Sequence, residues 1–303
     1  MLNKSQVKNI CYFLPPILSH RIQNKLYPTA DLQKESFTFL SKSINNTKLF
    51  GNSNDFIAAQ FYFHGYFEWR NIVLMKAVSQ IFDGVCLEIG ANIGTETLSY
   101  SKFFEKGVFA FEPEPKNFLK LKETKDINNL VNLKIFQLGV SDKEENLEFK
   151  VSEASNSGTG YFSKHSGDMN LKLIKLDDFF KDRLGSCAGM VIDVEGFELK
   201  VLKGASEIIN EFQPVIILEV NPSLMKERAD EGLEELVAFF DKKEYVYRQI
   251  SALNLKKLNI ENFKKQTHVN WIAIPNTKEF LFRKFSRLLW MNAFNPFFKK
   301  FIF

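Results

Sequence analysis

The feature that most constrains the fold is a regular alternation of strand-like and helix-like segments between residues 68 and 274. Short apolar runs alternate with longer segments in which apolar residues recur at helical spacing. This alternation predicts an α/β fold with a doubly wound, mostly parallel sheet and right-handed crossovers. The predicted strands are 85–89, 108–112, 133–138, 190–194, 214–220, 245–250 and 270–274, and the predicted helices are 68–82, 95–105, 116–127, 198–212 and 232–243. In such a sheet the ligand lies beyond the carboxyl ends of the strands.

The same pattern divides the chain into three parts. Residues 1–70 are rich in Phe and Tyr without clear periodicity, and we expect an irregular N-terminal extension there. Residues 71–277 are expected to form the α/β domain, in which 146–151 and 171–176 are strands of an antiparallel insert. Residues 278–303 form a basic, aromatic tail.

Cysteine usage and the lack of long apolar runs favour a cytoplasmic protein. The three cysteines are odd in number and lack Cys-x-x-Cys spacing, so we expect neither a disulfide framework nor a zinc site. The apolar run at 10–18 is short and is interrupted by Pro15 and Pro16, which disfavours a signal peptide. No run in the sequence is long enough to span a bilayer.

The stretch CLEIGANIGTETLSY, residues 86–100, has the form of a turn that binds a nucleotide cofactor. A dinucleotide turn needs two closely spaced glycines so that the pyrophosphate approaches the backbone, but Gly90 and Gly94 stand four residues apart. The wider spacing favours a cofactor without phosphate, whose carboxylate faces the helix N-terminus. S-adenosylmethionine is such a cofactor.

A second signal comes from Glu112, which ends the next predicted strand in the sequence FEPEP. A carboxylate in this place accepts hydrogen bonds from both ribose hydroxyls of a nucleoside. The glycine turn alone is also compatible with close packing of a helix on a strand. Together, the turn and the strand-terminal acid predict a cofactor site.

Several ordered motifs make the chain resemble the FkbM family of S-adenosylmethionine-dependent methyltransferases. They are EIGANIG (88–94), AFEPEP (110–115), LGVSD (138–142), LDD (176–178) and IDVEGFELKVLKGA (192–205), followed by PVIILEV. The resemblance covers roughly residues 85–275 and implies a class I methyltransferase fold with transfer to a hydroxyl, commonly of a sugar. The cofactor-binding residues that it implies are Glu88, Gly90, Ala91, Asn92, Gly94, Glu112, Gly139 and Val140.

One departure from the family concerns Val191, because the family usually has lysine before the IDVEG motif. It leaves open a catalytically inactive protein that keeps the cofactor fold. Retention of the glycine turn, Glu112, Asp193 and Glu195 favours the enzyme.

The candidate catalytic residues are carboxylates at two strand ends. Methyl transfer to an alcohol needs an aligned oxygen and a group that removes its proton. Asp193 and Glu195 lie at the end of the strand 190–194, and Glu219 lies at the end of the strand 214–220, so all three are expected to face the crevice as base or orienting groups.

Three alternatives remain for these side chains. Asp193 or Glu195 could instead cap the helix that begins near Glu198. Asp193, Glu219 and Asn221 could hold a magnesium ion. The four histidines, His20, His64, His165 and His268, have no metal-ligand spacing, although His165 and His268 lie late enough in the chain to reach the crevice.

The tail has the pattern of an interfacial helix. Leu281, Phe285, Leu288 and Leu289 share one helical face, flanked by Arg283, Lys284 and Arg287. Six basic residues and one acid give residues 278–303 a net charge of +5. The whole chain has a net charge of +4, so residues 1–277 carry −1. We expect this tail to bring the enzyme to an anionic surface on the inner face of the membrane, and packing on the domain or on a partner is the alternative.

The sequence therefore predicts a methyltransferase whose partner is a sugar or glycan acceptor. No groove that combines aromatic and basic residues indicates a nucleic-acid substrate.

Overall fold

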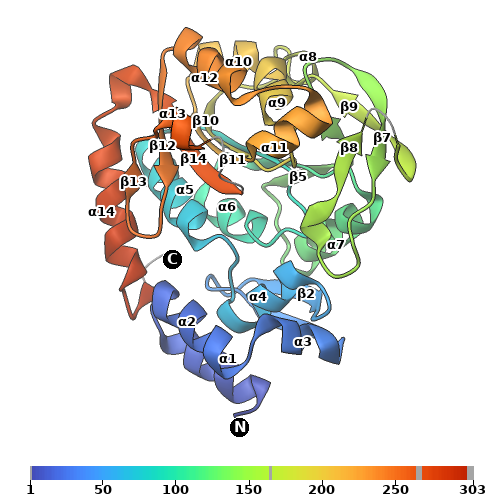
Figure 1. Ribbon diagram of the computed structural model, residues 1–303, viewed down its shortest axis with the longest axis vertical. Helices are drawn as coiled ribbons and strands as arrows, with labels where there is room; N and C mark the ends of the chain where they lie inside the picture. Colours follow the sequence, from blue (N-terminus) through green and yellow to red (C-terminus); the bar gives the residue numbers. More distant parts are fainter. Residues whose placement is uncertain (1, 164–165, 264–267, 299–303) are drawn as a thin grey trace.

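The structure is a computed structural model that describes residues 2–163, 166–263 and 268–298. The strands of its main sheet are β3 (Val85–Ile89), β4 (Val108–Phe111), β5 (Leu133–Phe136), β10 (Cys187–Ile192), β11 (Val215–Val220), β12 (Tyr245–Ile250), β13 (Leu255–Lys256) and β14 (Val269–Pro275). They lie in the order β13-β12-β14-β11-β10-β3-β4-β5 (Figure 1). The five strands from β11 to β5 are parallel, whereas β14, β12 and β13 pair antiparallel. The predicted doubly wound, mostly parallel sheet is confirmed.

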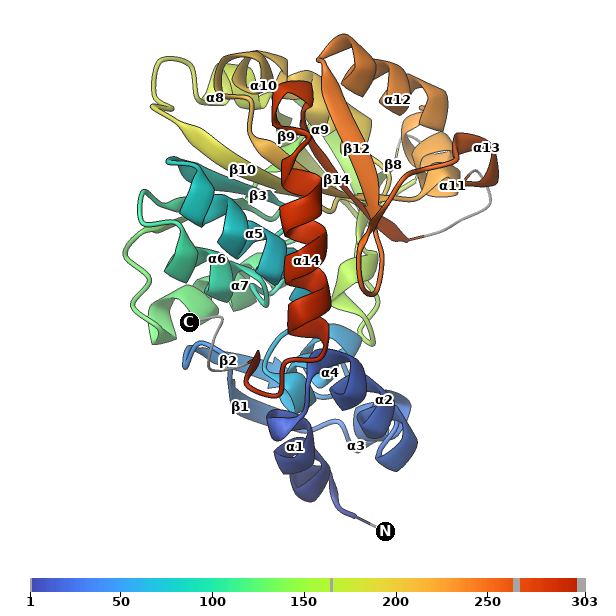
Figure 2. The same cartoon turned by 90° about the vertical axis from the view of Figure 1, so that its left-hand side faces the viewer.

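Helices cover both faces of this sheet (Figure 2). One face carries α5 (Trp69–Ile81), α6 (Thr97–Phe103), α7 (Pro115–Ile127) and α14 (Leu281–Ala293). The other carries α8 (Leu176–Phe179), α9 (Glu198–Gly204), α10 (Ser206–Phe212) and α12 (Leu233–Lys242). Each set packs on the sheet through its own core of buried apolar side chains. Short helices α11 (Pro222–Leu224) and α13 (Ile260–Phe263) lie in the connections.

The predicted helix over 198–212 is two helices instead of one. The first ends at Gly204, whose backbone lies so close to Ser141 that a Cβ would approach the carbonyl oxygen of Ser141 to 2.0 Å. The carboxylate of Asp177 then accepts hydrogen bonds from the N–H groups of Glu207 and Ile208, both at 3.1 Å, at the start of the second helix. These two bonds satisfy N–H groups in the first turn of α10.

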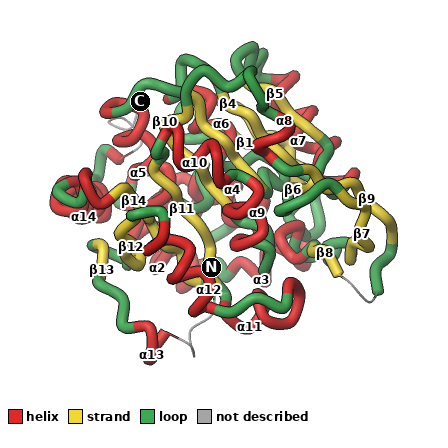
Figure 3. Tube along the Cα trace, turned by 90° about the horizontal axis from the view of Figure 1, so that it is seen from above, coloured by secondary structure: helices red, strands yellow, loops and turns green. Residues whose placement is uncertain are grey.

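The insert between β5 and β10 forms a sheet of its own. Its strands are β6 (Gly139–Val140), β7 (Glu145–Lys150), β8 (Tyr161–Ser163) and β9 (Met169–Ile174). Their order is β6-β9-β7-β8, and the β7–β9 pair is antiparallel, as predicted. Seen from above, the insert lies at the opposite side of the molecule from β13 (Figure 3).

The N-terminal segment is not irregular, so the prediction for residues 1–70 is wrong in its local structure. It contains α1 (Lys4–Phe13), α2 (Pro16–Leu26), α3 (Thr29–Glu35), the hairpin β1 (Thr38–Lys42) with β2 (Lys48–Asn52), and α4 (Phe56–His64). Asn3 and Gln6 cap α1 reciprocally, and Pro16 starts α2, which are local helix signals. Short elements with a small separate core around Val7 and Phe63 explain why no clear period is visible.

The tail also differs from the prediction. Leu281, Phe285 and Leu289 are buried, and α14 packs with them against α5. The prediction that this side of the helix faces a membrane is therefore wrong, because these residues belong to the core. Residues 299–303, which include two of the six basic residues of the tail, lie outside the described part of the chain. Within the described ranges, every helix is too short or too polar to cross a bilayer.

Candidate active site

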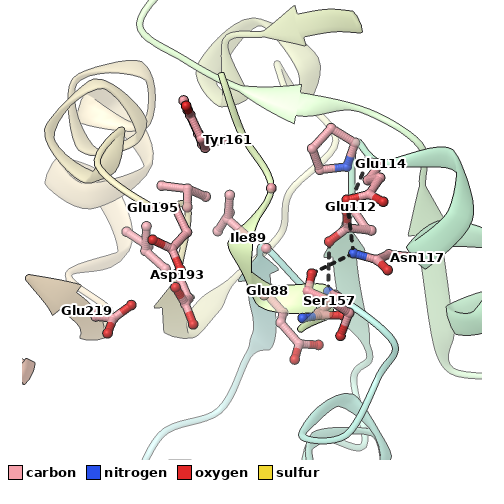
Figure 4. A pocket seen from close by; sticks show the side chains of 18 of the residues that line it. Glu88, Ile89, Glu112, Glu114, Asn117, Ser157, Tyr161, Asp193, Glu195 and Glu219 are labelled. Atoms are coloured by element: carbon pink, nitrogen blue, oxygen red, sulfur yellow. Dashed lines mark hydrogen bonds between the residues drawn. The ribbon is translucent and has the colours of Figure 1, made fainter. Parts of the chain in front are cut away.

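A cavity of about 520 Å³ opens at the carboxyl ends of β3, β4, β10 and β11. The N-terminal segment closes one side with Phe56 and Ile57 of α4, and residues 156–162 of the insert close another. Figure 4 shows two groups of side chains facing each other across it, with Glu88 and Ile89 between them. Glu112, Glu114, Asn117 and Ser157 form one group, and Asp193, Glu195 and Glu219 belong to the other.

The glycine turn brings two strand ends together. Gly90 has φ +89°, and a Cβ there would lie 1.7 Å from the carbonyl oxygen of Asp193, so only glycine fits. Ala91 and Asn92 line the cavity next to it. Gly94 is absent from the lining and instead packs on α7, where a Cβ would meet Leu121 at 2.9 Å.

Glu112 is held by the turn that it faces. Its carboxylate accepts hydrogen bonds from the N–H of Asn92 at 2.8 Å and from the N–H of Glu114 at 2.9 Å. Burial raises the pKa of Glu112 to about 7, although these two N–H groups oppose the shift. Since each carboxylate oxygen accepts more than one hydrogen bond, both remain able to accept from a ligand.

Glu88 is the residue before the last one of β3, and it is 4% exposed. Burial raises its pKa to about 8, against the lowering effect of the Thr97 hydroxyl. Among the described residues, Glu88 Oε2, Asn92 Oδ1, Asn117 Oδ1 and Ser157 Oγ are buried cavity-lining atoms with no hydrogen-bond partner. Buried polar atoms of this kind are costly unless a ligand pairs with them.

The second group is a cluster of acids around His268. Asp193 and Glu219 line the same side of the cavity, and His268 Nδ1 lies 3.1 Å from Glu219 Oε1. Loss of solvation on the cavity floor, with the charges of Glu219 and Glu195, raises the pKa of Asp193 well above its ordinary value. Burial and the Glu195 charge raise the pKa of Glu219 to about 8. Burial and repulsion between these acids therefore favour the protonated form of both Asp193 and Glu219.

Glu195 is engaged by a cation that sequence reasoning missed. Arg228 Nη1 lies 2.7 Å from the carbonyl oxygen of Glu195 and 3.2 Å from its Oε2. The same guanidinium lies 3.7 Å from the centroid of the Tyr161 ring. Glu195 has φ +53°, a strained conformation that the bond to its carbonyl stabilises.

The capping alternative for Asp193 and Glu195 is wrong. The start of α9 has no side-chain cap, and Glu198 Oε1 instead accepts from the N–H of Gly196 at 2.9 Å. Asn221 caps α11 through its Oδ1, which accepts from Leu224 at 3.4 Å. The described acids and histidine whose atoms lie close enough to hold a metal are Glu195, Glu219 and His268, all within 4.8 Å of one another. His165 lies outside the described residues.

Sequence reasoning also missed the polar lid over the Glu112 side of the cavity. Glu114 accepts from the Ser152 hydroxyl at 2.9 Å and from the Ser152 N–H at 3.1 Å. Asn117 donates to the carbonyl of Ser157 at 2.9 Å. These bonds hold residues 152–160 of the insert over the cavity. Only Glu114 had a sequence signal, because it lies in the FEPEP motif.

Two further predicted cofactor-binding residues, and the departure at Val191, also lie at this cavity. Gly139 and Val140 line the cavity at the start of the insert, and Val191 lines its floor beside Ile217. An apolar side chain thus occupies the position where the family usually has lysine.

Strand order, the glycine turn and a cavity at the strand ends together define a class I methyltransferase fold. The methyltransferase FkbM domain matches residues 88–249 of this chain. The chain therefore belongs to the FkbM methyltransferase family, whose methyl donor is S-adenosylmethionine.

Known proteins similar to this chain include one curated relative. Hexuronic acid methyltransferase AglP of Haloferax volcanii is 33% identical over 138 residues, which are 45% of this chain and 55% of that protein. The chain thus matches about half the length of this relative.

Solved structures are similar at lower identity. Methyltransferase FkbM of Methylobacillus flagellatus is 14% identical, with a TM-score of 0.44 over 84% of this chain and 60% of the other. M. jannaschii TYW2 in complex with AdoMet is 16% identical, with a TM-score of 0.41 over 78% of this chain and 84% of the other.

The cavity fits S-adenosylmethionine in the chemistry of its donor set. The unpaired buried oxygens at Glu88, Asn92, Asn117 and Ser157 suit a ligand with amino and hydroxyl donors. The surplus of carboxylates suits a ligand whose sulfur carries a positive charge.

Proposed function

We propose that this chain transfers a methyl group from S-adenosylmethionine to a hydroxyl of a sugar, within a glycan or a lipid-linked saccharide. The observation that carries the proposal is the cluster of Asp193 and Glu219, with His268 next to Glu219, opposite the Glu112 side of one cavity. The similarity to a hexuronic acid methyltransferase supports a sugar as the acceptor.

In this proposal one side of the cavity holds the cofactor. Glu112 accepts from the ribose hydroxyls, and Glu88 accepts from the amino group. The turn at Gly90, Ala91 and Asn92 allows the backbone to approach the cofactor closely. Gly139 and Val140 flank the adenine ring of the cofactor. When bound, S-adenosylmethionine supplies an electrophilic methyl group on a positively charged sulfur.

The other side would orient the acceptor and take its proton. One of the two carboxyl groups, Asp193 or Glu219, once deprotonated, accepts a hydrogen bond from the sugar hydroxyl and takes its proton. His268 hydrogen-bonds Glu219 and can balance the charge as the proton moves. Glu195 is bound to Arg228, so we assign it an orienting role and assign the base to the pair.

The chemistry of the cavity favours a hydroxyl over a carboxylate as the methyl acceptor. A hexuronic acid offers both groups, and a carboxylate needs no base. Among the described lining residues, Arg228 is the one arginine or lysine, whereas acids line both sides. A neutral hydroxyl therefore meets less repulsion beside Asp193 and Glu219 than an anion does. Alkali distinguishes the products, because it cleaves a methyl ester and leaves a methyl ether.

A magnesium-dependent reaction is the second candidate, since Glu195, Glu219 and His268 have atoms within 4.8 Å of one another. The ion pair of Glu195 with Arg228 competes with metal binding and favours the metal-free base. Chelation tests this: activity lost with chelator and restored by magnesium supports the metal, and unchanged activity supports the carboxyl pair.

We also propose that an anionic membrane surface is a partner, through a different side of α14 from the one predicted. Trp290, Met291, Phe294 and Phe297 are 57%, 49%, 48% and 54% exposed. Vesicle sedimentation of the full chain tests this proposal: a Trp290→Ala, Phe294→Ala double variant should pellet less with anionic vesicles than the unchanged chain. Equal pelleting would contradict it.

A further inference from the structure

A second cavity, of about 440 Å³, lies between α2, the start of α5, the loop after β12 and the end of α14. Phe67 and Glu68 line both this cavity and the active-site cavity. The second cavity is therefore the neighbour of the proposed acceptor region, although none of the predicted site residues lies in it.

Two arginines and a histidine make up most of its polar lining. His20 and Arg21 come from α2, and Arg70 comes from the first turn of α5. Glu68 is the one acid among the described lining residues. Its Oε2 accepts a hydrogen bond from Asn270 Nδ2 at 3.2 Å, and Asn270 lines the active-site cavity. The charge of this cavity is thus opposite to that of the active site.

Arg70 has a buried hydrogen-bond donor that suits an anion. Its guanidinium carbon lies 4.9 Å from the centroid of the Trp69 ring, within the range of a cation–π contact. Its Nε is buried and has no hydrogen-bond partner among the described residues. An N–H of a guanidinium that is buried without an acceptor is costly, and a phosphate oxygen is the acceptor that suits it best.

An exposed basic and aromatic stripe leads along α14 to this cavity. Arg283, Arg287, Trp290 and Phe294 are spaced at i, i+4, i+7 and i+11, so they share one face of the helix, and all are exposed. Phe294 also lines the cavity. Because α14 contacts α2, the stripe and Arg21 belong to neighbouring elements.

We propose that the second cavity binds the phosphate group of an anionic lipid, with the stripe of α14 lying in the headgroup layer. Arg70 and Arg21 supply the charge for the phosphate, and Trp290 and Phe294 supply the apolar contact that a lipid adds and a soluble phosphate lacks. The site goes beyond methyl transfer and does not depend on it. It would place the active-site cavity, across Phe67 and Glu68, next to a membrane surface.

The test is sedimentation of the full chain with phosphatidylcholine vesicles, with and without phosphatidylglycerol. Arg70→Gln should weaken binding to the phosphatidylglycerol vesicles by about tenfold or more, which is the loss of one charge-assisted hydrogen bond. Arg183→Gln is the matched control, since it removes the same charge from an exposed loop between α8 and β10. Equal effects of the two substitutions would overturn the proposal, because they would show attraction by net charge alone.

Two further arms keep the result decisive. Arg21 is exposed, so Arg21→Gln should fold normally and weaken binding in the same direction even if Arg70→Gln is unstable.

In the second of these experiments, inorganic phosphate and pyrophosphate are titrated against the full chain without vesicles. Arginine-dependent binding of these ions, with no vesicle binding, would identify a soluble phosphate ester as the ligand and would overturn the lipid. Binding to neither probe would overturn the site. Calorimetry with S-adenosylmethionine separates these outcomes from failure of the proposed methyl transfer.

Discussion

Replacing Glu112 with alanine should weaken the binding of S-adenosylmethionine by about 10- to 150-fold. The carboxylate is held by the N–H groups of Asn92 and Glu114, at 2.8 and 2.9 Å, so its position does not depend on the ligand. In the proposed complex it accepts from the ribose hydroxyls, and hydrogen bonds to a charged group contribute about 1.5–3 kcal/mol. That free energy converts to the stated change in affinity. Titration calorimetry measures it directly.

A matched control for Glu112 is available in Asp177. It is a buried carboxylate, 6% exposed, that also accepts from two backbone N–H groups, both at 3.1 Å. It does not line the cavity. Asp177→Ala should lower the free energy of unfolding without changing cofactor affinity. An unchanged affinity in Glu112→Ala, or tighter binding of NAD than of S-adenosylmethionine, would refute the assignment of the cofactor half.

The other predictions concern the chemical step, pH and the tail. Asp193→Asn and Glu219→Gln should keep cofactor affinity while single-turnover methylation falls by about two orders of magnitude or more, and wild-type turnover in both variants would move the base to another group. Burial raises the pKa values of Glu88 and Glu112 to about 8 and 7, so the folded protein without ligand binds more protons than the unfolded chain. Its free energy of unfolding should therefore fall as the pH rises from 5 to 8. The affinity for S-adenosylmethionine should rise as the pH rises from 6 to 8. This rise should be larger than the rise in affinity for the demethylated product, whose sulfur is uncharged; a flat profile in calorimetry would contradict these shifts. Phe285→Ala, at a fully buried position of α14, should cost about 3–5 kcal/mol in denaturant unfolding, whereas Trp290→Ala, 57% exposed, should cost far less.

The main sheet and the cofactor turn were predictable because their signals are local. Buried parallel strands read as continuous apolar runs, and β3, β4 and β11 begin within one residue of their predicted starts. The glycine at 90 is required by one backbone contact, and Glu112 is at a strand end, so both follow from spacing along the chain.

Contacts between distant segments were not predictable in the same way. Arg228 reaches Glu195 from a π-helical turn after α11, and the short helices of residues 4–35 bury few apolar residues each, so neither leaves a periodic signal. The apolar face of α14 was visible in the sequence, but an amphipathic pattern does not distinguish a protein core from a membrane. Packing on α5 decided that question.

The domain boundaries and the roles of Asp193, Glu195 and Glu219 stay predictions. The structure brings these three residues together on one side of the cavity and adds His268 and Arg228 to them.

The central claim is transfer of a methyl group from S-adenosylmethionine to a sugar hydroxyl. Its most direct test is incubation of the full chain with methyl-labelled S-adenosylmethionine and saccharides from the source cells, followed by mass spectrometry before and after mild alkali. We predict label in a saccharide, stable to alkali as a methyl ether, and absent with Asp193→Asn. Label lost on alkali treatment would show a methyl ester and contradict the hydroxyl acceptor. Label in nucleic acid or protein, with none in saccharide, would contradict the claim as a whole.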